Sequence, residues 1–553
     1  MANAAIYLHP NGFDTTGKEL LGRHSAGESF LRGFLRHADV DRFFMWNSAW
    51  KPQAELDALL ARIHPLAKPV RWIGSRDRTA LQEAGVVNLP HPDLPAEAWR
   101  RRPYGGAAFS LCGITHTTAT ANVMRILPDL LISPTQDHDA LICTSNAVHD
   151  GVETQLEMVR EYLAAEFGPR RRPEPMRVVI PLGVNVDDFA TTEEHRRAWR
   201  EKLDIPDDAV VALYVGRFNV RAKMNPALMA LALERAARRT GKTICWVNSG
   251  WGPTPEVEAQ FHRDSAALCP SVLYRSVDGR PAETRFSIWS VADLFVSFSD
   301  NIQETFGLTP VEAMAAGLPC VVTDWNGYKD TVRDGEDGFR IPTIAPAPGA
   351  GRDLAYWFDN AWLNYDNYVG AAAQFTALDL DAAGAAIATL VDNPDLRRRM
   401  GESAHRRARE VFDWSVIIPQ YQALWAEQNA RRAAAAPVPP QHDNPMRPDP
   451  FRLFKSYPTH HLTADSRIAL APGMDTAAAL ELLNGPLTAY AAFQRPTQEE
   501  IGAVIVWLAG RGEATLRDLL LAIVPQPRRL TVSRGLIWMA RYGVLTIHPP
   551  AGG

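Results

Sequence analysis

The 553-residue chain has few cysteines, and none of them is arranged to bind a metal or to form an evident disulfide framework. The five are odd in number, widely spaced and mostly set in apolar runs: Cys112, Cys143, Cys245, Cys269 and Cys320. No pair has the short spacing of metal ligands. We therefore expect buried small hydrophobic residues in a reducing compartment, which favours the cytoplasm.

Long apolar runs and a strong excess of one charge are also missing. The most apolar windows, IGAVIVWLAG and LLLAIV, are much shorter than the roughly 20 residues that cross a bilayer, so we expect no transmembrane segment. The first residues, MANAAIYLHPNGFDTT, lack a basic start followed by a long apolar run, so we expect no secretory signal. The net charge of −5 excludes a chain that binds polyanions or membrane surfaces along its whole length.

Short β-branched, apolar runs alternate with helical patterns through the first 425 or so residues. The clearest predicted strands cover 4–9, 43–48, 140–145, 177–183, 210–216, 243–250, 294–299 and 318–324. Continuously apolar strands that alternate with helices predict buried parallel sheets with helices on both faces. The fold class expected is therefore α/β.

The alternation stops near residue 183 and restarts near residue 209, which predicts two tandem, doubly wound, Rossmann-like domains. We place them at 1–190 and 191–430, and interpret the polar stretch TTEEHRRAWREKLDIPDDA between the two sets of strands as a connector. Residues 431–450 are rich in Ala and Pro without periodicity, which predicts a linker. A third unit is expected over 451–553, with helices at 497–509, 514–523 and 529–542 and a strand at 543–548. Ligands of such folds bind at the carboxyl ends of the strands.

One segment, SFSDNIQETFGLTPVEAMAAGLPCVVTD, combines two glutamates with a strand-to-helix turn. Thr309 and Glu312 have the spacing of a capping box, so Glu312 could serve only to cap its helix. A helix start is also a favourable site for a phosphate, and Gly307 would let a ligand approach the backbone. Glu304, before the turn, could accept hydrogen bonds from sugar hydroxyls.

Two cations follow the strand at 210–216. Gly216 and Arg217 end it, and Lys223 comes six residues after the arginine. An arginine and a lysine placed this way suit a diphosphate, although in isolation a solvated arginine and lysine in a loop would be the better explanation.

The first domain offers two weaker candidates. Ser25 to Glu28 has the pattern of another capping box, which would put Gly27 in a first helical turn open to a phosphate. His116 ends the segment FSLCGITH at or just beyond a predicted strand. A lone histidine is more often structural than catalytic.

Taken together, these segments resemble family 4 glycosyltransferases over roughly residues 1–428. The donor-site signature of that family has two glutamates separated by seven residues and then a helix end like AMAAGLP, as in this chain. CTSNAV at 143–148, IPLGVNVDDF at 180–189 and VFDWSVIIPQYQALWAEQ, similar to a helix that crosses back to the first domain, are further landmarks. The resemblance implies the retaining GT-B fold, with an acceptor-side first domain and a donor-binding second domain.

The resemblance also implies roles for the candidate residues. Glu304 would contact the transferred sugar, and Glu312 would hold the ribose of the nucleotide. Amides near the start of the helix would meet the diphosphate or the sugar. The catalytic set implied is Glu304, His116, Arg217 and Lys223, and the donor-binding set is Gly27, Gly216, Arg217, Lys223, Phe306, Gly307, Leu308, Thr309 and Glu312.

The chain departs from the family pattern in three places. Thr305 replaces the usual small glycine after the first glutamate, and Asn326 to Asp330 replaces a Gly-Gly turn. Residues 344–379, which include Trp357, Trp362, Tyr365 and Tyr368, have the character of an insertion. Its aromatic residues could stack on a glycan or pack internally, and packing is the simpler expectation.

The unit at 451–553 resembles a winged-helix arrangement. Four arginines lie in or near its third predicted helix: Arg528, Arg529, Arg534 and Arg541. The unit has ten Lys/Arg and seven Asp/Glu, a balance of 10 − 7 = +3, which is weak for nucleic acid. A packing role, a protein partner or self-association is favoured over DNA binding.

The function expected is transfer of a sugar from a nucleoside diphosphate sugar to a carbohydrate, lipid-linked or small-molecule acceptor, with retention of configuration, as in polysaccharide or glycoconjugate synthesis. No tightly bound cofactor or metal is expected, and the location would be the cytoplasm or the inner membrane surface. Two alternatives stay open: a phosphorylase or sugar-nucleotide epimerase on the same scaffold, and a non-catalytic scaffold that acts through its last domain.

Overall fold

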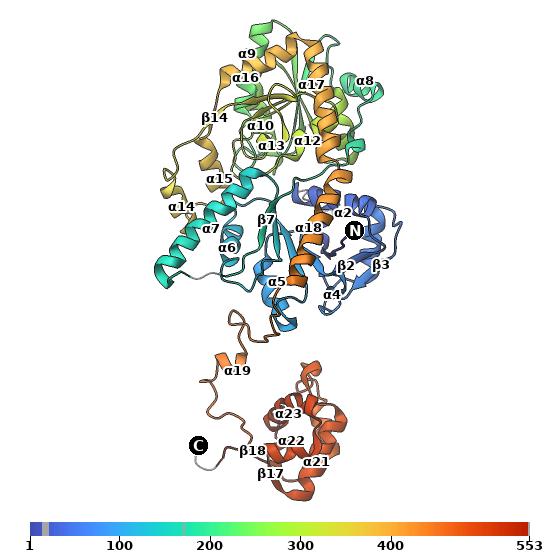
Figure 1. Ribbon diagram of the computed structural model, residues 1–553, viewed down its shortest axis with the longest axis vertical. Helices are drawn as coiled ribbons and strands as arrows, with labels where there is room; N and C mark the ends of the chain where they lie inside the picture. Colours follow the sequence, from blue (N-terminus) through green and yellow to red (C-terminus); the bar gives the residue numbers. More distant parts are fainter. Residues whose placement is uncertain (14–21, 170–171, 551–553) are drawn as a thin grey trace. The chain divides into compact units, whose positions relative to one another are not determined.

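The computed structural model describes residues 1–13, 22–169 and 172–550 (Figure 1). The chain divides into two compact units, Met1–His442 and Asp443–Gly553. The first unit contains two parallel sheets, each covered by helices, as expected for tandem Rossmann-like domains. In the part of the chain that the structure describes, no helix has the length and apolarity needed to cross a membrane.

The first sheet has seven parallel strands in the order β3-β2-β1-β4-β5-β6-β7. The strands are β1 (Ala5–Leu8), β2 (Phe43–Asn47), β3 (Val70–Ile73), β4 (Val86–Asn88), β5 (Ser110–Ile114), β6 (Ala140–Cys143) and β7 (Met176–Val179). The helices are α1 (Pro10–Phe13), α2 (Gly22–His37), α3 (Gln53–Ile63), α4 (Leu81–Ala84), α5 (Leu94–Arg101), α6 (Ala121–Asp129) and α7 (Asn146–Phe167). Every residue of the central strands β4, β5 and β6 is buried, as continuous apolar strands between two helical layers should be.

The second sheet has six parallel strands in the order β10-β9-β8-β11-β12-β13. The strands are β8 (Val210–Val215), β9 (Ile244–Gly250), β10 (Leu273–Asp278), β11 (Leu294–Ser297), β12 (Cys320–Thr323) and β13 (Gly338–Ile341). The helices are α8 (Glu193–Lys202), α9 (Ala227–Thr240), α10 (Pro255–Leu268), α11 (Ala282–Ser287), α12 (Leu308–Ala315), α13 (Tyr328–Thr331), α16 (Leu380–Asp392), α17 (Pro394–Arg407) and α18 (Trp414–Ala434).

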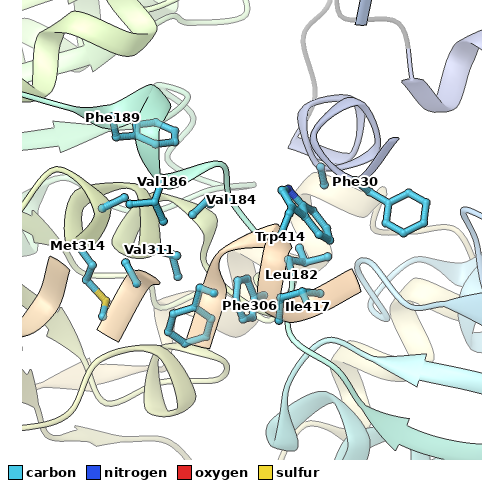
Figure 2. Close-up of a cluster of buried hydrophobic side chains, with 14 of the residues drawn as sticks. Phe30, Leu182, Val184, Val186, Phe189, Phe306, Val311, Met314, Trp414 and Ile417 are labelled. Atoms are coloured by element: carbon cyan, nitrogen blue, oxygen red, sulfur yellow. The ribbon is translucent and has the colours of Figure 1, made fainter. Parts of the chain in front are cut away.

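Helix α18 returns from the second domain to the first, where it packs against α2 (Figure 1). Two backbone hydrogen bonds fix the chain in this region: Trp414 N donates to Val184 O, and Val184 N donates to Phe412 O. Figure 2 shows Trp414 and Ile417 between first-domain and second-domain side chains of one continuous core. The crossover helix expected from the sequence is therefore confirmed.

The insertion forms a small helical hairpin. Its base is the antiparallel pair β14 (Thr343–Ile344) and β15 (Ala377–Leu378), and its two helices are α14 (Arg352–Asp359) and α15 (Tyr365–Gln374). The expectation that its aromatic residues pack holds for one face only. Tyr365 and Tyr368 are partly buried, whereas Trp362 is 66% exposed.

The second unit has a three-stranded antiparallel sheet in the order β17-β16-β18 and its own apolar core. The elements are α19 (Pro450–Leu453), β16 (Arg467–Leu470), α20 (Thr476–Leu483), α21 (Gln498–Arg511), β17 (Glu513–Thr515), α22 (Leu516–Ile523), α23 (Arg529–Arg541) and β18 (Leu545–His548). The three predicted helices and the final strand are present, while β16, α20 and β17 were not predicted.

The polar connector before residue 209 contains helix α8, which packs on the second domain: its Trp199 is 6% exposed and donates its indole N–H to Ser287 Oγ at 3.0 Å. One predicted boundary needs correction. The predicted linker begins too early, because α18 continues to Ala434 and Gly106 N donates to Val438 O at 3.2 Å. Alanine is a good helix former, and a run of alanines therefore extends α18 instead of ending it.

The five cysteines are all buried and free, as expected from their apolar surroundings. Burial raises the pKa of the Cys112 thiol to about 12, which keeps it protonated and unreactive.

Candidate functional site

The candidate cations and the first candidate carboxylate meet at one edge of the second sheet. Arg217 and Lys223 follow β8, and Glu304 follows the neighbouring strand β11. Because parallel strands place their carboxyl ends at the same edge, the two loops lie side by side. Lys223 Nζ donates to Glu304 Oε2 at 2.5 Å, and the two side chains are only 22% and 14% exposed.

Glu304 is held in its ionised form. Burial works to raise its pKa, but the charge and the hydrogen bond of Lys223 and the backbone amides of Thr305 and Phe306 outweigh burial, so the pKa lies below its ordinary value. Thr305 N donates to Glu304 Oε1 at 3.2 Å. The site therefore contains a fixed carboxylate whose remaining lone pairs can accept hydrogen bonds.

The turn after Glu304 brings backbone close to the site. Gly307 adopts φ +89°, and a Cβ at this position would lie 2.2 Å from Cε1 of Tyr328, so no other residue fits. The ring of Phe306 is 1% exposed and contacts Phe412 edge-on. Phe306 can therefore contribute to a ligand only through its backbone, as expected from the sequence.

The predicted capping box at Thr309 and Glu312 is wrong. Helix α12 begins at Leu308, its N-cap is Gly307, and no side chain caps it. The left-handed glycine turns the chain into the helix earlier than the Thr-Pro pair suggested, which leaves Thr309 inside the first turn. Glu312 therefore does not cap α12, and capping does not explain why a glutamate stands at this position.

The carboxylate of Glu312 is half-buried and has no hydrogen-bond partner among the residues that the structure describes. Burial raises the pKa of Glu312 to about 7, although the positive charges of Arg285 and Lys223 oppose the shift. A buried acceptor without a protein partner is costly, so such groups often serve a ligand.

Arg217 is the second free group of the site. Its Nη2 is 3.5 Å from Ala222 O, and within the described ranges it forms no ion pair with a carboxylate. Gly216 precedes it, and a Cβ there would lie 2.5 Å from Oη of Tyr214, so close packing explains this glycine. A partly buried guanidinium without a carboxylate is suited to a bidentate contact with a phosphate.

His116 lies just beyond β5, as predicted. Its Nε2 is 3.2 Å from the carbonyl oxygen of Pro90, a contact that orients the ring. The neighbouring residue Thr117 reaches the second half of the unit, because its Oγ1 is 3.5 Å from the hydroxyl of Tyr365. His116 therefore precedes Thr117, whose contact with Tyr365 connects the first domain to the turn that contains Glu304.

The second predicted capping box, at Ser25 to Glu28, is also wrong. Helix α2 already runs from Gly22, so Gly27 lies beyond its first turn. A Cβ on Gly27 would lie 1.9 Å from Gly12 O, and close packing of α2 on α1 explains this glycine. The preceding residues 14–21 lie outside the described part of the chain, and among the described residues no hydrogen bond joins Gly27 to the second-domain candidates.

Sequence reasoning missed several residues that join the two domains beside Glu304. Ser145 Oγ donates to Thr305 O at 2.6 Å, and Asn146 donates from its backbone and side-chain nitrogens to Asp330 at 2.7 and 3.1 Å. Gln303 accepts from the Tyr365 hydroxyl at 3.1 Å. The segments that contain Ser145 and Asp330 stood out in the sequence, but no pattern indicated that these residues would meet.

Across the described residues, no group of three or more His, Cys, Asp or Glu side chains could hold a metal ion. The arrangement is thus two free groups, Arg217 and Glu312, around the ion pair of Lys223 and Glu304 and the start of α12. It can bind an anion through cations and backbone amides, and hydroxyl groups through two carboxylates.

Comparison with known proteins agrees with this geometry. Residues 195–347 match the family described as glycosyl transferases group 1, a range that contains every second-domain candidate. The D-inositol 3-phosphate glycosyltransferase of Corynebacterium efficiens is 29% identical over 263 residues, 46% of this chain and 51% of the relative. That of Geodermatophilus obscurus is 33% identical over 183 residues, 32% of this chain and 39% of the relative. The chain spans about half the length, or less, of these curated relatives.

Solved structures with a similar course of the chain include the Anabaena protein HepE in complex with UDP. The similarity has 14% sequence identity and a TM-score of 0.49, and it covers 77% of this chain and all of that one.

Proposed function

We propose that this chain transfers a sugar from a nucleoside diphosphate sugar to an acceptor, with retention of anomeric configuration. The observation that carries the proposal is the pair of free groups at one sheet edge: the unpaired guanidinium of Arg217 and the unpartnered carboxylate of Glu312. A nucleoside diphosphate sugar offers the matching groups, a diphosphate for the cation and ribose hydroxyls for the carboxylate.

The chemical step needs orientation and electrostatic stabilisation. The bond from the anomeric carbon to the diphosphate oxygen breaks, the acceptor oxygen bonds to the same face, and the acceptor proton passes to a phosphate oxygen of the leaving group. Negative charge then develops on the diphosphate, where Arg217, Lys223 and the amides at the start of α12 would stabilise it. Glu304, fixed by Lys223, would hold hydroxyls of the sugar.

Gly27 and His116 are proposed to face the donor from the first domain. For His116 the support is its place after β5 and the contact of its neighbour Thr117 with Tyr365. For Gly27 the support is the family resemblance alone. Acceptors to test include carbohydrates and lipid-linked sugars, together with inositol phosphate, which the names of the relatives suggest. We also propose that the protein is located in the cytoplasm or at the inner membrane surface.

The proposal predicts large losses of transfer in Glu304→Ala and Lys223→Ala. Each change breaks the ion pair beside the reacting sugar, so we expect kcat to fall on the order of 100-fold or more, as when one preorganised charge-stabilising group is removed from an active site. The measurement is turnover of a panel of sugar nucleotides, after a thermal-shift screen has identified the nucleotide that binds.

Lys242→Ala is the matched control, because Lys242 forms a lysine–aspartate pair with Asp392 at 3.1 Å on the exposed surface. It should leave turnover unchanged. Unchanged turnover in both site variants would contradict the proposal. Free phosphate as the acceptor, or an epimerised nucleotide without transfer, would instead favour a phosphorylase or an epimerase.

A further inference from the structure

The insertion at 344–379 places one helix, α15, against both halves of the candidate site. Asn367 Oδ1 accepts from Arg221 Nη1 at 3.1 Å, and a Cβ on Gly370 would lie 3.0 Å from the Cβ of Arg221. The helix therefore lies directly on the loop that carries Arg217 and Lys223. A larger residue than glycine at 370 would push it away.

A small apolar cluster joins this helix to the first domain. Val369 of α15 is fully buried, and it shares the cluster with Ala119 of the first domain and Ala222 of the second. Tyr365 and Met124 pack against the same cluster. The insertion thus contacts residues close to His116 on one side and Lys223 on the other.

A series of hydrogen bonds also joins helix α15 to both domains, next to this apolar cluster. The Tyr365 hydroxyl donates to Gln303 Oε1 at 3.1 Å and lies 3.5 Å from Thr117 Oγ1, at the outer limit of a hydrogen bond. Gln303 in turn donates its side-chain amide to Ala222 O, the carbonyl just before Lys223. One phenol therefore connects the residue after His116, the residue before Glu304 and the residue before Lys223.

Further hydrogen bonds tie the turn before Glu304 to the loop that contains Arg221. Asn301 Nδ2 donates to Arg221 O at 2.6 Å, and Gln303 N donates to Asn301 Oδ1 at 3.0 Å, so the turn is tied to the loop at both residues. Burial raises the pKa of Tyr365, so its hydroxyl remains a donor at neutral pH. Without that hydroxyl, Gln303 Oε1 would lose its donor.

We infer that Tyr365 is a positioning residue that holds the first-domain loop at Thr117 in register with Glu304 and Lys223, and so keeps water from the donor during transfer. The inference rests on the proposed function and assigns a role to a segment that departs from the family pattern. Tyr365 acts through Gln303 and Thr117, since it contacts neither catalytic candidate directly. Loss of register should favour attack by water over attack by the acceptor.

The test compares Tyr365→Phe with Tyr368→Phe in the full chain. Both variants remove a hydroxyl from α15 and keep the ring. Tyr368 stacks on Phe358 at a centroid distance of 4.2 Å, and its hydroxyl has no hydrogen-bond partner among the described residues. For Tyr365→Phe we expect kcat for transfer to fall about three- to tenfold, KM for the donor to change less than twofold, and the ratio of donor hydrolysis to transfer to rise at least threefold. Tyr368→Phe should match the wild type in all three.

A purely structural role would lower the amount of folded protein without changing the ratio of hydrolysis to transfer, so an unchanged ratio would overturn the inference. A second measurement does not need activity. Hydrogen exchange in peptides covering 117–124 and 219–224 should be faster in Tyr365→Phe than in Tyr368→Phe, and equal exchange would overturn the inference. If the wild type transfers no sugar from any donor, the proposed function fails and hydrogen exchange still decides the role of Tyr365.

Discussion

Two carboxylates only eight residues apart in sequence are held in different charge states by their neighbours. Glu304 accepts from Lys223 and from a backbone amide, and its pKa lies below the ordinary value. Glu312 is half-buried without a hydrogen-bond partner among the described residues, and its pKa is raised to about 7. Such a division is typical of sites in which two carboxylates have different tasks.

The raised pKa of Glu312 predicts a pH-dependent cost in stability. Between the unfolded value near 4.5 and the folded value near 7, the folded chain binds more protons than the unfolded chain. Stability from this group is therefore fully present below the unfolded pKa and is lost as pH rises toward 7. Glu312→Gln should raise the denaturation midpoint relative to wild type at pH 8 and much less at pH 5.

The same variant should bind the proposed donor more weakly, because an amide is a poorer acceptor for ribose hydroxyls than a carboxylate. In the wild type the nucleoside diphosphate should bind more weakly at pH 6 than at pH 8, since protonation of Glu312 removes the favoured acceptor. Calorimetric titration at both pH values checks this prediction of donor binding.

For the stability prediction, a stabilising effect of Glu312→Gln that is the same at pH 5 and pH 8 would show that Glu312 does not titrate in this range.

At the scale of elements, helix α18 joins the domains through one tryptophan that lies between two glycines. A Cβ on Gly33 would lie 2.4 Å from Trp414, and one on Gly183 would lie 2.5 Å from the same indole. Trp414 also donates its indole N–H to Ser29 Oγ at 2.7 Å. The crossover therefore requires glycine on both sides of the indole ring.

Two helix-interior glycines make a matched test of this packing. Gly33→Ala in α2 should destabilise the first unit by about 1–3 kcal/mol, because the added methyl overlaps the indole of Trp414. Gly151→Ala in α7 meets nothing within 4 Å and should stabilise by about 0.5–1 kcal/mol. Chemical denaturation measures both. Equal signs for the two variants would contradict the packing at Trp414.

Elements could be predicted from the sequence where they are buried on both faces. The central strands β5, β6 and β11 are fully buried and mostly apolar, and they were anticipated, β5 only through its end at His116. The missed strands β3, β10 and β13 are edge strands with partly exposed residues, and each contains an arginine that interrupts the apolar pattern. β4 has only three residues, too few for any periodicity to show.

The site was predictable to the extent that it is local in sequence. Arg217, Lys223 and Glu304 each follow a strand that was predicted, and parallel strands bring such residues to one edge. Both capping boxes failed because the same residue pattern also occurs after a helix has already begun. The contact of Tyr365 with Gln303 could not be predicted, since nothing in an insertion's sequence specifies which surface it packs against.

At the scale of the whole molecule, the two units have separate hydrophobic cores. The core of the second unit contains only residues between Ile468 and Leu545. Three of its four noted arginines form hydrogen bonds within it: Arg528 pairs with Glu500 at 2.8 Å, Arg529 donates to Val524 O at 3.2 Å, and Arg534 donates to Gln494 at 3.2 Å. A partner or self-association through residues 451–553 stays a prediction, and these internal contacts further weaken the case for a nucleic-acid face.

Separate cores predict separate unfolding. Leu536→Ala removes a fully buried side chain from the second core and should destabilise that unit by about 2–5 kcal/mol. Leu213, equally buried in the second sheet of the first unit, provides the reciprocal variant. In calorimetry of the full chain, each variant should lower one transition and leave the other in place.

Sugar transfer should survive Leu536→Ala at temperatures where the second unit has unfolded, because every residue of the proposed donor site lies before His442. A single transition that moves in both variants, or transfer that is lost when the second unit unfolds, would show that the second unit supports the chemistry of the first.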